Sequence, residues 1–251
     1  MSRSGAYKVN PGRPELSPFP TERVERPVML QWWKRLTFLH WRYDPALVAR
    51  FLPKGLEVDV FDGSAWVGLT PFVAEVRPPL APAMMALRFP ETNVRTYARA
   101  PDGSTGVWFF SLDAARKVAV LGARALYHLP YKLATMSVEC VPAGVHYASS
   151  RKEPGDNASA DILIEPDEAL TPVESHDLDH FLTARWRLYT LLPRGLGYAQ
   201  VEHPPWPLAR ARVLSIEQNL VTAAGLPPPQ GPPLVHYSHG VEVKVGRPRL
   251  L

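Results

Sequence analysis

The sequence predicts a strand-rich globular fold with few helices. The chain of 251 residues contains 28 prolines, which disfavour long helices and suit short strands joined by rigid loops. Several short segments alternate apolar and polar residues, and Asp-Gly turn signals lie between some of them. Hydrophobic residues make up 46% of the chain and charged residues 21%, an ordinary balance for a protein with a sizeable core. Together these features predict a mainly β, or β-rich α+β, protein.

The chain divides into a short arm and one domain. Residues 1–27 are rich in proline and show no apolar periodicity, so we expect a poorly ordered or surface-draped arm. No linker interrupts the remainder, which predicts a single domain over 28–251.

The first half of the domain contains a helix and two hairpins. Asp44-Pro45 is typical of a helix start, and Pro53 ends that helix. The Asp-Gly pair at 62–63 predicts a hairpin between the alternating segments 56–61 and 65–69. A second hairpin is expected between 93–98 and 106–112.

The second half alternates helices with strands. Asp113 is expected to cap a helix that continues to Tyr127 before Pro130. Strands are predicted at 136–141 and 162–164, with a polar loop over 149–160 between them. The remaining predictions are a helix over 177–192, a loop over 227–233 and a closing strand over 239–245.

Composition and motifs exclude several classes of protein. The net charge of +4 comes from scattered basic residues rather than a basic face, which argues against nucleic-acid binding. No apolar run approaches the roughly 20 residues of a membrane span, and the amino terminus lacks a secretory pattern, so a cytoplasmic protein is expected. No phosphate-binding loop, serine-hydrolase elbow or cysteine-pair metal motif occurs, so we expect no cofactor.

Three residues outside these motifs belong to types that can react or bind metal. Cys140 is the only cysteine and is predicted to be a small core residue of a strand. His176 and His180 lie four residues apart on the predicted helix, but they lack the zinc-protease pattern, and a solvated helix end is the simpler interpretation.

A row of polar residues is the first candidate site. If the segment around residue 94 is extended, alternate side chains share one face. A carboxylate, an amide, a guanidinium and a phenol on one face can bind and orient a small polar ligand. Spacing alone favours an ordinary solvent-facing strand instead. The residues in the row are Glu91, Asn93, Arg95 and Tyr97.

Lys132 is the second candidate. It lies among apolar residues, and a buried lysine has a lowered pKa and can become nucleophilic. Such a lysine more often reaches the surface with its aliphatic stem packed.

A set of motifs follows one another along about residues 27–247. They are Phe38-Leu39-His40-Trp41, Leu52-Pro53-x-Gly55-Leu56, Ala65-Trp66-Val67-Gly68, Glu91-x-Asn93-Val94-Arg95-Thr96-Tyr97, the segment from Gly106 to Ala114, Leu129-Pro130-Tyr131 and Pro205-Trp206-Pro207-Leu208. In this order the motifs resemble the bacterial YqjF-like family (domain of unknown function 2071), an uncharacterised family of the acetoacetate decarboxylase-like superfamily.

The resemblance implies a curved, mainly antiparallel sheet that closes toward a barrel or cone around a cavity, with a few peripheral helices. Acetoacetate decarboxylase uses a Schiff-base lysine. In the segment that resembles its motif, Arg124 matches the arginine, while Tyr131 stands in place of the Schiff-base lysine. Lys132 falls on the second lysine, and Glu91 is a counterpart of a strand glutamate. Since a phenol cannot form an imine, Lys132 could act only if a bulge or turn reversed its direction.

Three functions follow from these residues. The first is a cofactor-independent, lyase-like enzyme for a small carbonyl or carboxylate compound. In it Arg95 or Arg124 holds the anionic group, Glu91 moves protons, and Lys132 or Tyr131 acts as acid, base or nucleophile. The other residues expected to bind substrate are Asn93, Tyr97 and Trp108.

The second function is a non-catalytic binder of a small apolar or amphipathic metabolite. Its pocket is expected to be lined by Trp66, Trp108, Phe109 and Trp206. The third is structural, with an internal Glu91–Arg95 ion pair and no ligand. The superfamily resemblance also suggests a homo-oligomer.

Overall fold

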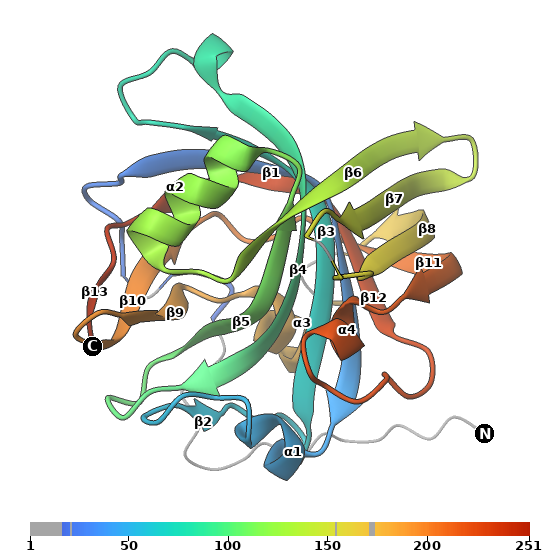
Figure 1. Ribbon diagram of the computed structural model, residues 1–251. Helices are drawn as coiled ribbons and strands as arrows, with labels where there is room; N and C mark the ends of the chain where they lie inside the picture. Colours follow the sequence, from blue (N-terminus) through green and yellow to red (C-terminus); the bar gives the residue numbers. More distant parts are fainter. Residues whose placement is uncertain (1–16, 21, 154, 171–173) are drawn as a thin grey trace.

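Long strands dominate the computed structural model, which describes residues 17–20, 22–153, 155–170 and 174–251 (Figure 1). They form one 13-stranded sheet in the described residues. The strands are β1 (Met29–Tyr43), β2 (Glu57–Val58), β3 (Ala65–Arg77), β4 (Leu87–Arg99), β5 (Thr105–Ala114), β6 (Tyr131–Val141), β7 (Gly144–Arg151), β8 (Ser159–Ala169), β9 (Arg187–Leu192), β10 (Gly195–Glu202), β11 (Leu208–Gln218), β12 (Leu234–Val245) and β13 (Arg249–Leu250). The helices are α1 (Pro45–Ala49), α2 (Lys117–Tyr127), α3 (Asp177–Thr183) and α4 (Leu220–Ala223), with a 3-10 turn η1 (Ala83–Met85).

The sheet closes on itself twice. One closed circuit runs through β1, β3, β4, β5, β9, β10 and β12. A second circuit leaves β5 through β6, β7, β8 and β11 and returns to β12, so both circuits share β12, β1, β3, β4 and β5. Most neighbours are antiparallel, but β5 pairs in parallel with β6 and β9. The predicted curved sheet closing toward a barrel is therefore confirmed.

Each circuit encloses its own core, and the shared strands are covered on both faces. On β4, Val94 faces the core within the second circuit, while Tyr97 faces the core within the first. Figure 1 shows α2 against one side of the sheet and α1 at the opposite end. No helix among the described residues is both long and apolar enough to cross a membrane.

The predicted hairpins have different outcomes. The second is confirmed, because Asn93 pairs with Leu112 and residue 98 with residue 106. The first is wrong as a pair of strands: β2 pairs with β4, not with β3. Its turn is real, since Asp62 and Gly63 both have positive φ and Phe61 and Ser64 bond across it.

Two helix predictions need correction. The helix predicted from Asp113 begins at Lys117, because Asp113 still belongs to β5 and bonds Arg151. It ends at Tyr127 as predicted, and His128 adopts a left-handed conformation there. The helix predicted over 177–192 stops at Thr183, and β9 follows, so the apolar positions 188 and 189 belong to a strand.

Two smaller predictions are also corrected. The predicted loop over 149–160 is shorter, since β7 extends to Arg151 and β8 begins at Ser159. Cys140 lies in a strand but is exposed rather than part of the core. Most of the predicted arm, residues 1–16 and 21, lies outside the described residues.

Candidate functional site

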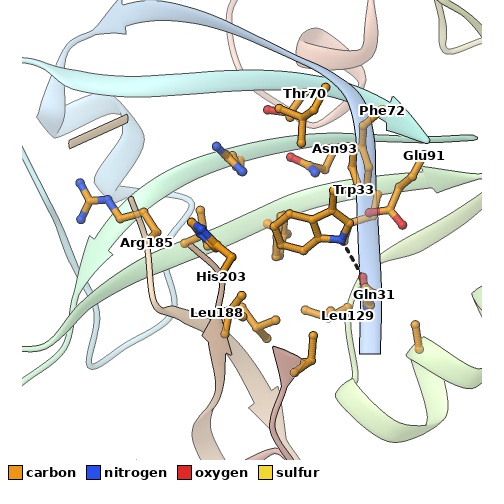
Figure 2. Close-up of a pocket in the computed structure, with 18 of the residues that line it drawn as sticks. Gln31, Trp33, Thr70, Phe72, Glu91, Asn93, Leu129, Arg185, Leu188 and His203 are labelled. Carbon is orange, nitrogen blue, oxygen red and sulfur yellow. Dashed lines mark hydrogen bonds between the residues drawn. The ribbon is translucent and has the colours of Figure 1, made fainter. Parts of the chain in front are cut away.

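A cavity of about 100 Å³ lies inside the first circuit of strands (Figure 2). A volume of this size accommodates several waters or a molecule of a few non-hydrogen atoms. Its walls are largely apolar, with a few polar side chains, the usual pattern of a small-molecule site. The lining residues are Met29, Gln31, Trp33, Leu36, Thr70, Phe72, Glu91, Asn93, Arg95, Val107, Phe109, Leu112, Ala123, Tyr127, Leu129, Tyr131, Thr183, Arg185, Leu188, Val201, His203, Trp206 and Val245.

The polar row of β4 forms one wall of this cavity. Glu91, Asn93 and Arg95 all line it, as the two-residue period of a strand requires. Tyr97 continues the row into the core and is fully buried. Figure 2 shows Glu91 and Asn93 beside Thr70 of β3, with which Asn93 pairs in register. The interpretation of this row as a solvent-facing strand is wrong, because the first circuit covers the face that carries it.

Two guanidinium groups reach the cavity, and they differ in their partners. Arg185 donates to Asp59 at 2.7 Å, and both side chains are buried. Arg95 donates instead to the Leu182 carbonyl at 3.3 Å and to the Tyr97 hydroxyl at 3.4 Å. Within the described residues no carboxylate forms an ion pair with Arg95. A buried cation without a counter-charge is costly, and an anionic ligand would offset that cost.

Several polar atoms of the cavity wall have no hydrogen-bond partner within the described part of the chain. They are Thr70 Oγ1, Asn93 Oδ1, Arg95 Nε and Arg185 Nη2. Buried polar groups usually are paired, so each unpaired group requires an explanation. A cluster that combines donors with an acceptor can orient a polar ligand.

Glu91 and Tyr131 form a buried acid pair. The Tyr131 hydroxyl donates to Glu91 Oε2 at 3.0 Å. Burial raises the pKa of Glu91 from 4.5 to about 8; the hydrogen bond from Tyr131 opposes this, and nearby Asp113 adds to it. Burial, together with Glu91, raises the pKa of Tyr131 well above 10.0. Glu91 is therefore mostly protonated at neutral pH.

Aromatic rings and an imidazole close another side. The rings of Trp33 and Trp206 stack with their centroids 6.0 Å apart, and the ring centroid of His203 lies 4.9 Å from that of Trp206. Burial lowers the pKa of His203 from 6.5 to about 4, so its ring is neutral at pH 7. Trp33 Nε1 donates to Gln31 at 2.7 Å (Figure 2). With Glu91 and His203 neutral and Arg185 paired, the positive charge of Arg95 dominates the cavity.

Tyr131 and Lys132 point in opposite directions. Tyr131 pairs with Leu112 and lines the cavity with it, whereas Lys132 pairs with Asp113 on the other face. Lys132 Nζ donates to Glu153 at 2.5 Å and its side chain is 33% exposed. The strand is regular there, so no bulge turns Lys132 inward.

The other predicted site residues lie apart from the cavity. Arg124 is exposed and contacts Glu153 and the Tyr131 carbonyl. Trp108 packs near Tyr189 in a separate cluster, and Trp66 does not line the cavity either. Of the aromatics expected in a pocket, Phe109 and Trp206 are present.

The structural alternative for Glu91 and Arg95 is wrong, because no ion pair joins these two described residues and Glu91 bonds Tyr131 instead. The described residues also contain no group of three or more histidine, cysteine, aspartate or glutamate side chains arranged to hold a metal. His176 caps α3, with its backbone N–H donating to Asp179.

Sequence reasoning missed several polar residues of the cavity: Gln31, Thr70, Thr183, Arg185 and His203. They come from β1, β3 and the segments around α3 and β10, and only the closed sheet brings them together. The motif beginning at Pro205 did point to this wall through Trp206. Arg185 falls within the helix predicted over 177–192, and no local pattern separates it from an ordinary core-facing position.

Solved structures with the same architecture define the class. The enduracididine biosynthesis enzyme MppR, complexed with the condensation product of pyruvate and imidazole 4-carboxaldehyde, is 14% identical; the match covers 92% of this chain and 92% of that chain with a TM-score of 0.62. Acetoacetate decarboxylase from Legionella pneumophila is 13% identical, with 96% and 92% covered and a TM-score of 0.60. This chain therefore has an acetoacetate decarboxylase-like fold.

The sequence itself identifies the family. Residues 30–242 match DUF2071, described as an uncharacterized conserved protein. The chain is also 38% identical over 219 residues to the uncharacterized protein YqjF of Bacillus subtilis (strain 168), a match that covers 86% of this chain and 89% of that protein. The chain belongs to the DUF2071 family, as its motifs predict.

Proposed function

We propose that the cavity binds a small carbonyl compound that carries a carboxylate, and that Glu91 exchanges a proton with it in a cofactor-independent, lyase-like reaction. One observation carries the proposal: two different groups lie on the same face of β4. One is the buried guanidinium of Arg95, which has no carboxylate partner among the described residues, and the other is the protonated carboxyl of Glu91. Arg95 attracts the anion, and Thr70 can donate a hydrogen bond to it through its unpaired hydroxyl.

The chemistry follows from the Glu91 pKa of about 8, which is near the pH of most cells and suits proton transfer in either direction. When the bond between the α-carbon and a carboxylate group breaks, its electron pair moves through the α-carbon onto the carbonyl oxygen, and the carboxylate group departs as carbon dioxide. Arg95 stabilises the resulting enolate, and protonated Glu91 gives its proton to the α-carbon. In the reverse sense, ionised Glu91 removes an α-proton and forms the same enolate.

Imine chemistry has less support. Tyr131 faces the cavity at the position that resembles the Schiff-base lysine, while Lys132 faces outward toward Glu153. None of the described residues that line the cavity is a lysine. We therefore give Tyr131 the role of hydrogen-bond donor to Glu91, and Lys132 no role in the reaction.

The fold neighbours add support of a limited kind. MppR is solved in complex with pyruvate, and other neighbours are named as acetoacetate decarboxylases. Both names concern small carbonyl carboxylates, and such molecules match the volume and charge of this cavity. They provide a first panel of compounds for this chain.

Proton exchange into pyruvate tests the proposal. In deuterated buffer we expect the protein to accelerate loss of the methyl proton signal of pyruvate, measured by NMR. Glu91→Gln should slow this exchange by about 10²- to 10⁴-fold, the usual worth of a general base. Lys132→Ala should leave it unchanged. Equal rates for wild type and Glu91→Gln, or loss of exchange in Lys132→Ala, would contradict the assignment.

A second function is a non-catalytic binder of a small apolar or amphipathic metabolite. The observation in its favour is the apolar majority of the wall, including Phe72, Phe109 and Trp206. Binding of pyruvate without any proton exchange, across a range of pH, would favour this second function.

A further inference from the structure

A surface groove of about 1090 Å³ adjoins the cavity. It lies between the end of β10 and the strands β12 and β1, beside the turn η1. Its walls include Phe19, Gln31, Trp32, Ala83, His203 and Pro205.

The groove lies where two strands of the sheet separate. β10 pairs with β12 only at residues 201 and 202, opposite 245 and 244. After Glu202 the chain leaves β12 and forms the proline-rich segment 203–207. The groove is consequently lined by residues from both faces of β12: Val241 and Val243, which pack in the core around the cavity, and Glu242 and Lys244, which point the other way.

Gln31 and His203 line both the groove and the cavity, and therefore mark the boundary between them. His203 is held in place by a 2.7 Å hydrogen bond to the Pro204 carbonyl and by its contact with Trp186. Its ring is neutral at pH 7, so the boundary presents no charge to a passing chain. Gln31 is fixed by Trp33.

The groove offers an apolar surface to a ligand. Phe19 is 61% exposed and Trp32 is 43% exposed, and alanine and proline side chains provide much of the rest. Several of its charged groups already have partners. Lys244 pairs with Glu202 at 2.9 Å, Glu75 pairs with Lys34 at 2.9 Å, and Arg77 donates to the Ala81 carbonyl.

We propose that the natural ligand is an amphipathic monocarboxylate whose acid group lies in the cavity at Arg95 and whose apolar tail passes between Gln31 and His203 into this groove. The inference rests on the proposed function, because it requires that the cavity hold a carboxylate. The expected substrate is a carboxylate with a straight or aromatic apolar chain that is longer than the cavity alone can hold.

A series of straight-chain carboxylates tests this inference. Calorimetric titration of the wild-type protein with butanoate, hexanoate, octanoate and decanoate should show affinity that rises with length. About fourfold is expected for each methylene buried, the equivalent of its transfer from water. Affinity that stays flat or falls once the chain exceeds the cavity would overturn the inference.

A variant in the groove locates the tail. Trp32→Ala should weaken decanoate binding about tenfold while butanoate binding is unchanged, since only the longer chain reaches this side chain. Leu214→Ala is the matched control, because Leu214 is similarly exposed on β11 and does not line the groove. If decanoate affinity falls equally in both variants, or does not fall in Trp32→Ala, the tail lies elsewhere.

The two proposals fail in different ways. If butanoate and pyruvate bind in an Arg95-dependent manner but decanoate does not bind, the cavity is closed toward the groove. In that case only the proposal of an amphipathic ligand is wrong. If neither short acid binds, the proposed function itself is wrong.

Discussion

Glu91 is a carboxyl group that keeps its proton at neutral pH, and this property affects stability as well as chemistry. Its side chain is buried in the cavity wall, and its pKa of about 8 in the folded protein lies above the ordinary 4.5. The bound proton therefore stabilises the folded state fully below pH 4.5. That contribution is lost as the pH rises toward and through 8.

Glu91→Gln should remove this dependence on pH. The wild-type free energy of unfolding is expected to decline between about pH 4.5 and 8 relative to that of the variant, whose amide does not titrate. Urea unfolding of both proteins at several pH values measures the difference. Parallel pH profiles would show that Glu91 is ionised at neutral pH.

Substitution by methionine should have opposite effects on the stability of the protein at Arg95 and at Arg185. Arg95→Met removes a buried charge that has no carboxylate partner, so we expect stability to rise by about 1 kcal/mol or more. Arg185→Met removes the buried cation that pairs with the buried carboxylate of Asp59 and should cost about 3 kcal/mol. Chemical denaturation measures both. Destabilisation of the same size in both variants would indicate that Arg95 is a structural residue.

At the scale of elements, β4 shows what the sequence could and could not reveal. The two-residue period correctly placed Glu91, Asn93 and Arg95 on one face. It could not reveal that this face is buried, because burial depends on strands far away in the chain that close the first circuit. The same limit explains the residues 187–192, whose apolar spacing fits a helix and whose pairing with β10 makes them a strand.

On β6 the sequence did predict which side chain faces the cavity. Because side chains alternate along a strand, Tyr131 and Lys132 are expected to point to opposite faces, and they do so in the structure. The residues supplied by β1, β3 and the segment that follows β10 could not be found in advance, since no local pattern links Thr70 or His203 to the polar row.

Tyr131→Phe tests the role of this strand. The hydrogen bond from Tyr131 holds the pKa of Glu91 below the value that burial alone would give, so its removal should raise that pKa above about 8. Carbon-13 NMR titration of glutamate carboxyls measures the shift. Lys132→Ala is the control on the neighbouring residue and should leave the pKa of Glu91 unchanged. A lowered pKa in Tyr131→Phe would reverse the assigned donor.

At the scale of the whole molecule, the loop between β3 and β4 stands apart from both cores (Figure 1). Leu80 is 99% exposed and Met84 is 92% exposed, whereas Leu36, at 2%, lies in the core. Leu80→Ser and Met84→Ser should change the free energy of unfolding by less than about 0.5 kcal/mol. Leu36→Ala should cost about 2 to 5 kcal/mol. Denaturant unfolding of the three variants compares them, and a large loss at Leu80 or Met84 would reveal packing that the isolated chain lacks.

We propose that the ring of strands encloses a carboxylate site built around Arg95. Calorimetric titration with pyruvate tests it most directly, using wild type, Arg95→Met and the control Arg88→Met, whose arginine lies on the same strand but is exposed and pairs with Glu75. We expect binding by the wild type and by Arg88→Met, and loss of binding in Arg95→Met. Binding that survives in Arg95→Met, or no binding to any of the three proteins, would contradict the account.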